Sequence, residues 1–268
     1  MAKTLGHAIV VENKPGAGSV IGTQAVVQSN DGHTLLMGST SMTILPALRS
    51  DLPYDPVKDL QPVGMVSRQP LVLSVAADSP LKTLEGVIAR GRAGSELTAG
   101  NSGNGSLSHL TTELFNIRMG THLLPVPYKG ESALMPDIVG GTTAMAFLNL
   151  PSALPLLKAG RLRALALTSP ERSPLMPEVP GMIEAGFPDY SIAFWYGLFV
   201  PAGTPPEIIR KLYDATIAAS QRPEVKATLA REGTEVAVSK SPEEFAAFLA
   251  QDAKLWVRLA KESGAKAE

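Results

Sequence analysis

Residues 96–115 read ELTAGNSGNGSLSHLTTELF and join a short apolar run, a polar loop and a longer amphipathic run. The stretch holds three glycines, two asparagines and three serines. This order predicts a strand, a glycine-rich turn and a helix that begins after Gly105. The first backbone N–H groups of a helix lack intrahelical partners and lie at the positive end of its dipole. The loop is therefore predicted to hold an anion.

The backbone amides and hydroxyls of this loop are the predicted donors, because hydrogen bonds to a charged group are strong even without a counter-charge. The candidate ligand-binding residues in it are Ser102, Gly103, Asn104, Gly105, Ser106 and His109, with Ser108 as a further hydroxyl. A second candidate loop, Ser39, Thr40 and Ser41, follows another apolar run, as ligand loops do at the carboxyl edge of a sheet. An ordinary polar surface turn is the alternative for the first loop.

Strand-like and helix-like runs alternate along most of the chain. Strands are predicted over residues 8–11, 34–38, 62–77, 97–100, 123–128, 142–150, 162–169 and 194–201. Helices are predicted over residues 18–29 and 132–139 and after Thr83, Gly105 and Pro151, while residues 1–6 resemble the last turn of a helix closed by Gly6. The alternation predicts an α/β fold with parallel sheets.

The last third of the chain is predicted to be helical. Thr204-Pro205-Pro206-Glu207 and Ser241-Pro242-Glu243-Glu244 each combine a capping hydroxyl, an early proline and a glutamate, which is a helix-start signature. The second helix carries apolar residues at helical spacing, which predicts that this face is core. They are Phe245, Phe248, Leu249, Trp256 and Leu259.

Composition excludes several classes of function. The 268 residues contain 24 Lys plus Arg and 25 Asp plus Glu, and aromatic residues make up 5%, so nothing indicates nucleic-acid binding. The absence of cysteine excludes disulfides, thiolate metal sites and a cysteine nucleophile. No apolar run approaches the length of about 20 residues that spans a membrane, so the chain is not expected to be membrane-embedded.

The motifs of common enzymes are missing as well. The loop Gly103 to Ser108 lacks the third glycine of the dinucleotide fingerprint, and no phosphate-binding Gly-Lys-Ser/Thr is present. It also lacks Gly-x-Ser-x-Gly, and Ser108 and His109 are neighbours whose side chains point in different directions on a helix. The four histidines show no paired ligand spacing. No catalytic residue, metal or cofactor is therefore predicted.

Six segments in order resemble the Bug family, the TctC-type receptors of tripartite tricarboxylate transport systems. They are Val10 to Gly18, Leu52 to Asp59, Ser102 to His109, Pro127 to Gly130, Asn149 to Ser152 and Phe199 to Pro205. The resemblance runs from about residue 5 almost to the end of the chain, and it is specific because the segments keep their order.

The resemblance implies a two-lobed periplasmic-binding-protein fold that closes on a small carboxylate in the cleft between its lobes. The chain would then be a monomeric periplasmic receptor, not an enzyme, that delivers its ligand to a membrane permease. Its lobes would comprise residues 1–76 with 197–268, and residues 77–196. The same resemblance adds Tyr128 and Asn149 to the candidate ligand contacts.

Two departures from the family pattern bear on the site. Relatives have a signal peptide and then a first strand with a Pro-Phe-x-x-Gly-Gly loop, which we expect to be missing ahead of Met1. Leu148 stands where many relatives carry aspartate. An apolar side chain there cannot balance a ligand ammonium, which favours a carboxylate without an amino group. Trp195 fits equally an aromatic wall of the site or the packing of its strand.

Two other classes of function share these features. A periplasmic sensor would use the same ligand site and differ in its outer surface. A hydrolase acting on a carboxylate ester would need a base close to Ser106.

Overall fold

The computed structural model describes residues 1–14, 16, 19–94, 96–188, 190–231 and 233–266. These residues form two compact units, each built from discontinuous parts of the chain. The first unit comprises Met1–Arg68, Trp195–Ala230 and Glu235–Arg258. The second comprises Gln69–Phe194, Arg231–Thr234 and Leu259–Glu268.

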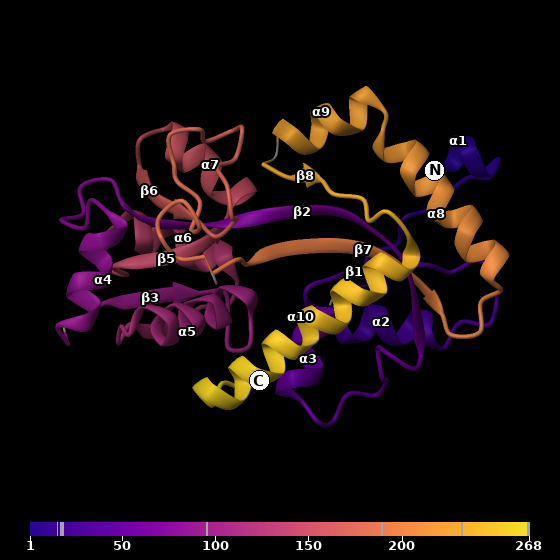
Figure 1. Ribbon diagram of the computed structural model, residues 1–268, viewed down its shortest axis with the longest axis horizontal. Helices are drawn as coiled ribbons and strands as arrows, with labels where there is room; N and C mark the ends of the chain where they lie inside the picture. Colours follow the sequence, from indigo (N-terminus) through magenta and orange to yellow (C-terminus); the bar gives the residue numbers. More distant parts are fainter. Residues whose placement is uncertain (15, 17–18, 95, 189, 232, 267–268) are drawn as a thin grey trace. The chain divides into compact units, whose positions relative to one another are not determined.

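The first unit contains a sheet in which β7 lies between β1 and the first part of β2. Its strands are β1 (Leu36–Ser39), β2 (Leu60–Ala76), β7 (Ala193–Pro201) and the short β8 (Glu235–Val236). Both β1 with β7 and β8 with β2 are antiparallel pairs. Its helices are α1 (Ala2–Leu5), α2 (Val20–Val27), α3 (Ser41–Leu48), α8 (Pro206–Ser220), α9 (Pro223–Arg231) and α10 (Pro242–Ser263) (Figure 1).

Alternate residues of β7 build two separate apolar clusters in this unit. Trp195 and Phe199 pack with Phe245 of α10. The intervening Leu198 and Val200 instead pack with residues of α8. Side chains alternate across a strand, so α8 and α10 bury opposite faces of β7.

The second unit is a mixed sheet in the order β2-β5-β3-β4, with β6 also paired to β2. Its further strands are β3 (Thr98–Asn101), β4 (Leu124–Pro127), β5 (Met145–Asn149) and β6 (Leu162–Leu167). Its helices are α4 (Leu84–Arg92), α5 (Leu107–Met119), α6 (Glu131–Val139) and α7 (Leu150–Lys158). Strand β3 is parallel to β4 and β5, whereas β2 is antiparallel to β5 and β6.

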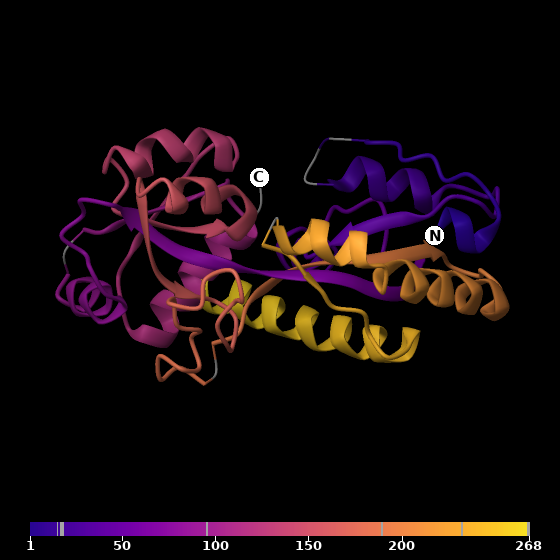
Figure 2. The ribbon, with the colours of Figure 1, turned by 90° about the horizontal axis from the view of Figure 1, so that it is seen from above.

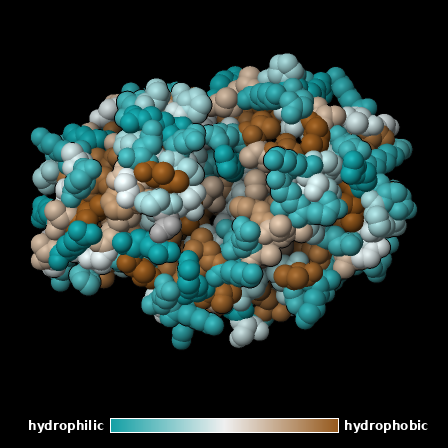
Figure 3. Space-filling view, viewed as in Figure 1, coloured by the Kyte–Doolittle hydropathy of each residue, from teal (hydrophilic) through white to brown (hydrophobic). Residues whose placement is uncertain are grey.

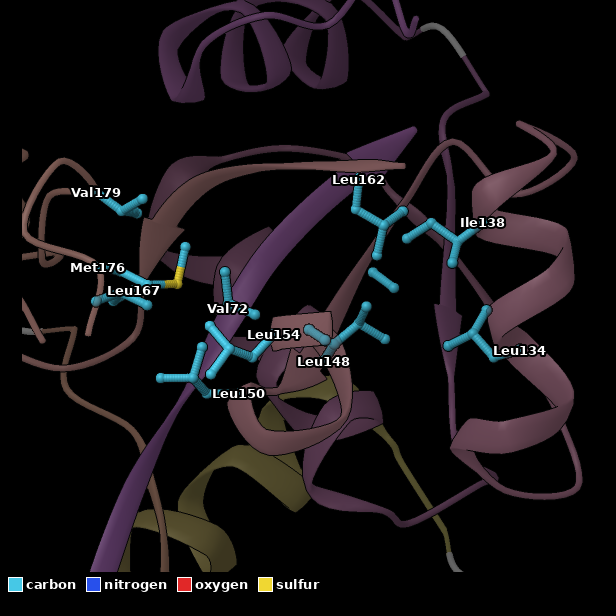
Figure 4. Close-up of a cluster of buried hydrophobic side chains, with 12 residues drawn as sticks. Val72, Leu134, Ile138, Leu148, Leu150, Leu154, Leu162, Leu167, Met176 and Val179 are labelled. Atoms are coloured by element: carbon cyan, nitrogen blue, oxygen red, sulfur yellow. The ribbon is translucent and has the colours of Figure 1, made fainter. Parts of the chain in front are cut away.

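Helices cover both faces of this sheet. Ala146 and Leu148 of β5 belong to a cluster with residues of α6 and α7, and Figure 4 shows how its side chains converge. Phe147, between them, contacts Phe115 of α5 at a ring distance of 5.7 Å. Accordingly, Figure 2 shows α6 and α7 on one side of these strands and α5 on the other.

Three expectations from the sequence were wrong. Residues 8–11 form no strand, and Val10 and Val11 are 87% and 82% exposed. The sheets are not purely parallel, because β1 pairs antiparallel with β7 in the first unit and β5 pairs antiparallel with β2 in the second. Thr204 does not cap α8, since its hydroxyl donates to the carbonyl of Pro201. Helix α3 was not predicted, and α9 lies in the last third of the chain, which was predicted to be helical without bounds for this helix.

Hydrophilic residues cover much of the face shown in Figure 3, and hydrophobic residues appear there in separate patches. Within the described part of the chain, no helix is long and apolar enough to cross a membrane.

Candidate functional site

The glycine-rich loop connects β3 to α5 in the second unit, as predicted. Ser106 is the N-cap of α5, and its Oγ accepts a hydrogen bond of 3.3 Å from the backbone N–H of His109. Gly103 and Gly105 have φ angles of 124° and 75°. Such positive φ angles strain other residue types, so glycine is what lets the chain turn sharply into the helix here.

The amides of this loop already have partners inside the loop. The N–H of Gly103 donates to Oδ1 of Asn101 at 3.0 Å, and that of Gly105 donates to Nδ1 of His109 at 3.0 Å. The N–H of Ser106 donates to the carbonyl of Gly103 at 3.1 Å. These three donors therefore stabilise the loop itself and would have to exchange partners to bind an anion.

Open donors appear one step later, in the first turn of α5. Among the described residues, the N–H groups of Leu107 and Ser108 make no hydrogen bond to a backbone carbonyl. Nδ2 of Asn101, a side chain with no exposed surface, has no hydrogen-bond partner among these residues either. Buried donors without partners are rare in folded proteins, so Nδ2 of Asn101 in particular needs an acceptor from elsewhere.

Three serine hydroxyls lie in a row at this helix terminus. Oγ of Ser108 accepts from the N–H of Ser102 at 3.0 Å and lies 3.1 Å from Oγ of both Ser102 and Ser106. A hydroxyl can rotate and donate in a new direction when an anion arrives. The row thus adds mobile protons to the fixed N–H groups of the helix.

His109 is buried, and its imidazole bonds to the backbone of the loop rather than to a serine hydroxyl. Its Nδ1 accepts the N–H of Gly105, and its Nε2 lies 3.6 Å from Oε1 of Glu113. A ring nitrogen that accepts a backbone N–H is not free to take the proton of a serine hydroxyl. This arrangement does not favour the hydrolase alternative.

The second predicted loop divides into exposed and structural residues. Oγ atoms of Ser39 and Ser41 lie 3.1 Å apart at the end of β1, and both residues are partly exposed. Thr40, between them, is 1% exposed, and its Oγ1 accepts the N–H of Trp195 at 3.1 Å. Ser39 and Ser41 can therefore meet a ligand, whereas Thr40 fixes the loop to β7.

Asn149 is held by a neighbouring carboxylate. Its N–H and its Nδ2 donate to the two carboxylate oxygens of Glu131, each at 2.7 Å. Its Oδ1 is buried and has no hydrogen-bond partner among the described residues. Burial raises the pKa of Glu131 above its usual value, and the hydrogen bonds from Asn149 oppose that shift.

Of the remaining candidates, Tyr128 is partly exposed, whereas Leu148 and Trp195 are buried. The hydroxyl of Tyr128 donates to Asp137 at 2.8 Å and lies 2.7 Å from Oγ1 of Thr143, so it ties β4 to α6. Leu148 has no exposed surface and lies in the apolar cluster of Figure 4. Trp195 is 1% exposed and contacts Phe245 at a ring distance of 5.7 Å. The structure thus assigns Leu148 and Trp195 to the cores of their units.

Sequence reasoning gave no role to two residues of this region. Asn101 ends β3 immediately before the loop, and a polar residue at the carboxyl end of a strand is the signal that could have identified it. Glu131 starts α6 and resembles any acidic first-turn residue in sequence, so only the structure reveals its pairing with Asn149. In the described part of the chain, no cluster of acidic or histidine side chains could hold a metal ion.

Comparisons with known proteins agree with this architecture. The family model of the tripartite tricarboxylate transporter family receptor, TctC, matches residues 1–265. Protein BugT of Bordetella pertussis is 37% identical over 267 residues, which is 98% of this chain and 82% of BugT.

Solved structures show the same fold over nearly the whole chain. An R. palustris protein with adipate is 31% identical, with a TM-score of 0.86 over 100% of this chain and 90% of that one. MatC from Rhodopseudomonas palustris with bound malate is 30% identical, with a TM-score of 0.80 over 96% and 90% of the two chains. Periplasmic binding proteins with a two-lobed fold are among the structural neighbours, which confirms the predicted α/β fold class.

These findings confirm the resemblance that the six sequence segments indicated. The family model and the BugT match each extend over nearly the entire chain. The chain belongs to the tripartite tricarboxylate transporter receptor family, TctC, whose members are solute-binding proteins.

Proposed function

We propose that this chain is a periplasmic receptor that captures a small carboxylate and delivers it to the permease of a tripartite transporter. The observation that carries the proposal is the start of α5. There, two N–H groups that have no backbone partner among the described residues lie beside a row of three serine hydroxyls. Two relatives of known structure hold adipate and malate, which supports a carboxylate as the ligand.

The ligand carboxylate would lie at the N-terminus of α5. It would accept hydrogen bonds from the N–H groups of Leu107 and Ser108, from the hydroxyls of Ser102 and Ser106, and from Nδ2 of Asn101. Each hydrogen bond to a charged group contributes roughly 1.5–3 kcal/mol, and the helix dipole adds up to about 1 kcal/mol at an exposed terminus. A neutral set of donors can therefore bind an anion without lysine or arginine.

Further contacts would come from other predicted residues. Ser39 and Ser41 of the first unit are partly exposed, and Asn149 of the second unit has a buried Oδ1 acceptor without a partner among the described residues. An acceptor of this kind suits a ligand hydroxyl or a protonated acid group. Leu148, buried beside Asn149, would act only by leaving no charged group there.

The wider assignments follow from the family. The receptor would act as a monomer without enzymatic activity, and its lobes would comprise residues 1–76 with 197–268, and residues 77–196. The permease would bind the liganded form.

A thermal-shift screen tests the ligand class. The panel comprises malate, adipate, citrate, glutamate and nicotinate, with the amides of malate and adipate as uncharged controls. A ligand at about a hundred times its Kd stabilises the folded state by roughly 2.7 kcal/mol. For a chain of this size, that corresponds to an increase in Tm of about 5–10 °C. Stabilisation by the amides alone, with no shift from any acid of the panel, would refute a carboxylate receptor.

A further inference from the structure

The only two tryptophans of the chain donate to the same carboxylate oxygen in the first unit. Nε1 of Trp195 lies 3.2 Å, and Nε1 of Trp256 3.0 Å, from Oδ2 of Asp252 on α10. The hydroxyl of Thr43 on α3 lies 2.5 Å from the same oxygen. Asp252 therefore connects α3, α10 and the beginning of β7 at a single atom.

A carboxylate in this position requires compensation. Burial is the main cause that raises the pKa of Asp252, and the hydrogen bonds from Thr43 and the two indoles oppose the shift. Replacing this network by apolar side chains of similar size would often cost a protein little stability. Holding α3, α10 and β7 together is therefore only a weak explanation for an aspartate at position 252.

The network continues into the loop that carries Ser39 and Ser41. Oγ1 of Thr43 lies 3.0 Å from the carbonyl oxygen of Thr40, and Oγ1 of Thr40 accepts the backbone N–H of Trp195. The one proton of the Thr43 hydroxyl goes either to Asp252 or to the carbonyl of Thr40, which also accepts the N–H of Ile44 at 3.1 Å. Thr40 is consequently linked to Asp252 mainly through its side chain and Trp195. Because Thr40 lies between Ser39 and Ser41, its backbone orientation determines where their two hydroxyls point.

We propose that Asp252 is a positioning residue for ligand binding, which fixes the Ser39–Ser41 loop through Thr43 and Trp195. The proposal rests on the proposed function, because it requires that Ser39 and Ser41 contact the carboxylate. Tryptophan emission should then report changes in this loop, because both indole N–H groups of the chain donate to Asp252. Ligand contacts with Ser39 and Ser41 would move Thr40 and change the hydrogen bond of Trp195.

The first test compares Asp252→Asn with the unchanged chain in calorimetric and fluorescence titrations with the carboxylate panel named above. Asparagine keeps the volume but loses the charge and replaces one acceptor by a donor. A residue that acts on a binding site through its neighbours typically changes the ligand affinity about 3- to 30-fold. We expect Asp252→Asn to lower the affinity by a factor in this range. The ligand-induced change in tryptophan emission should shrink in parallel. Glu262→Gln, on the exposed end of the same helix, should change neither quantity.

A second pair of variants decides the question if Asp252→Asn fails to fold. Thr43→Val removes the hydroxyl between Asp252 and Thr40, whereas Thr43→Ser keeps it. Weaker binding in the valine variant and restored binding in the serine variant would support the positioning role. Folded Asp252→Asn or Thr43→Val with unchanged affinity would overturn this role while leaving the receptor function intact. No binding of any panel member by the unchanged chain would overturn both.

Discussion

The Ser106→Asp variant should bind a carboxylate ligand at least about a hundredfold more weakly than the unchanged chain, a loss of roughly 2.7 kcal/mol or more. Aspartate is as good an N-cap as serine, and its charge interacts favourably with the positive end of α5. The same charge would lie beside the ligand carboxylate. Two unit charges 4 Å apart repel by about 4 kcal/mol at the effective dielectric constant near a protein surface. Calorimetric titration measures the affinity, and thermal unfolding verifies that the fold is kept.

The matched control is Thr83→Asp. Thr83 is the N-cap of α4 in the same unit, and its Oγ1 accepts the N–H of Gly86 at 3.1 Å, so the same change is made at another helix terminus. This control should bind normally. Equal affinity of both aspartate variants would show that the ligand is not bound at α5. Aspartate is preferable to alanine at position 106, because alanine would also remove the cap and cost about 0.5–2 kcal/mol of stability.

The largest loss of stability is expected for Phe245→Ala, about 3–5 kcal/mol in the free energy of unfolding. Phe245 has no exposed surface, and its ring lies 5.4 Å from that of Phe199 and 5.7 Å from that of Trp195. It packs over Gly197, where even a methyl group would lie 2.3 Å from Cζ of Phe245. Truncation would therefore leave a cavity that the neighbouring rings cannot easily fill.

Urea unfolding followed by circular dichroism measures this loss. Val257→Ala on the same helix is the control, because Val257 is 40% exposed and should contribute less than about 1 kcal/mol. A loss below about 1 kcal/mol for Phe245→Ala would mean that α10 does not pack on β7 as described.

Sequence patterns predicted those helices whose capping residues and apolar spacing match the way they pack in the structure. Ser241 caps α10, and Phe245, Trp256 and Leu259 on this helix are buried as their spacing predicted. The helix end at Gly6 was also predicted, with φ at 75°. The strand predicted for residues 8–11 was wrong because an apolar run indicates β propensity but does not show whether a neighbouring strand is present to pair with it.

Much of the candidate site could be located but not resolved in detail. The sequence placed the loop, its glycines and the helix start after Gly105 correctly, because these follow from local turn chemistry. The N-cap role of Ser106 came from the structure. The sequence could not show that Asn101 and His109 would take the loop amides, since this depends on side-chain directions in the folded state. The burial of Leu148 and Trp195 could not be predicted for a similar reason: a central strand buried on both faces gives no periodic signal that separates core-facing from ligand-facing side chains.

The most direct test of the receptor assignment is isothermal titration calorimetry of the full chain with adipate and malate, each against its diamide. A diamide matches the acid in size, but it lacks the charge that the N-terminus of α5 would bind and replaces one acceptor oxygen of each carboxylate by an NH2 donor. Our account predicts saturable binding of at least one acid, with one ligand per chain and no measurable heat from its diamide. Equal binding of acid and diamide, or no binding of either acid, would contradict it.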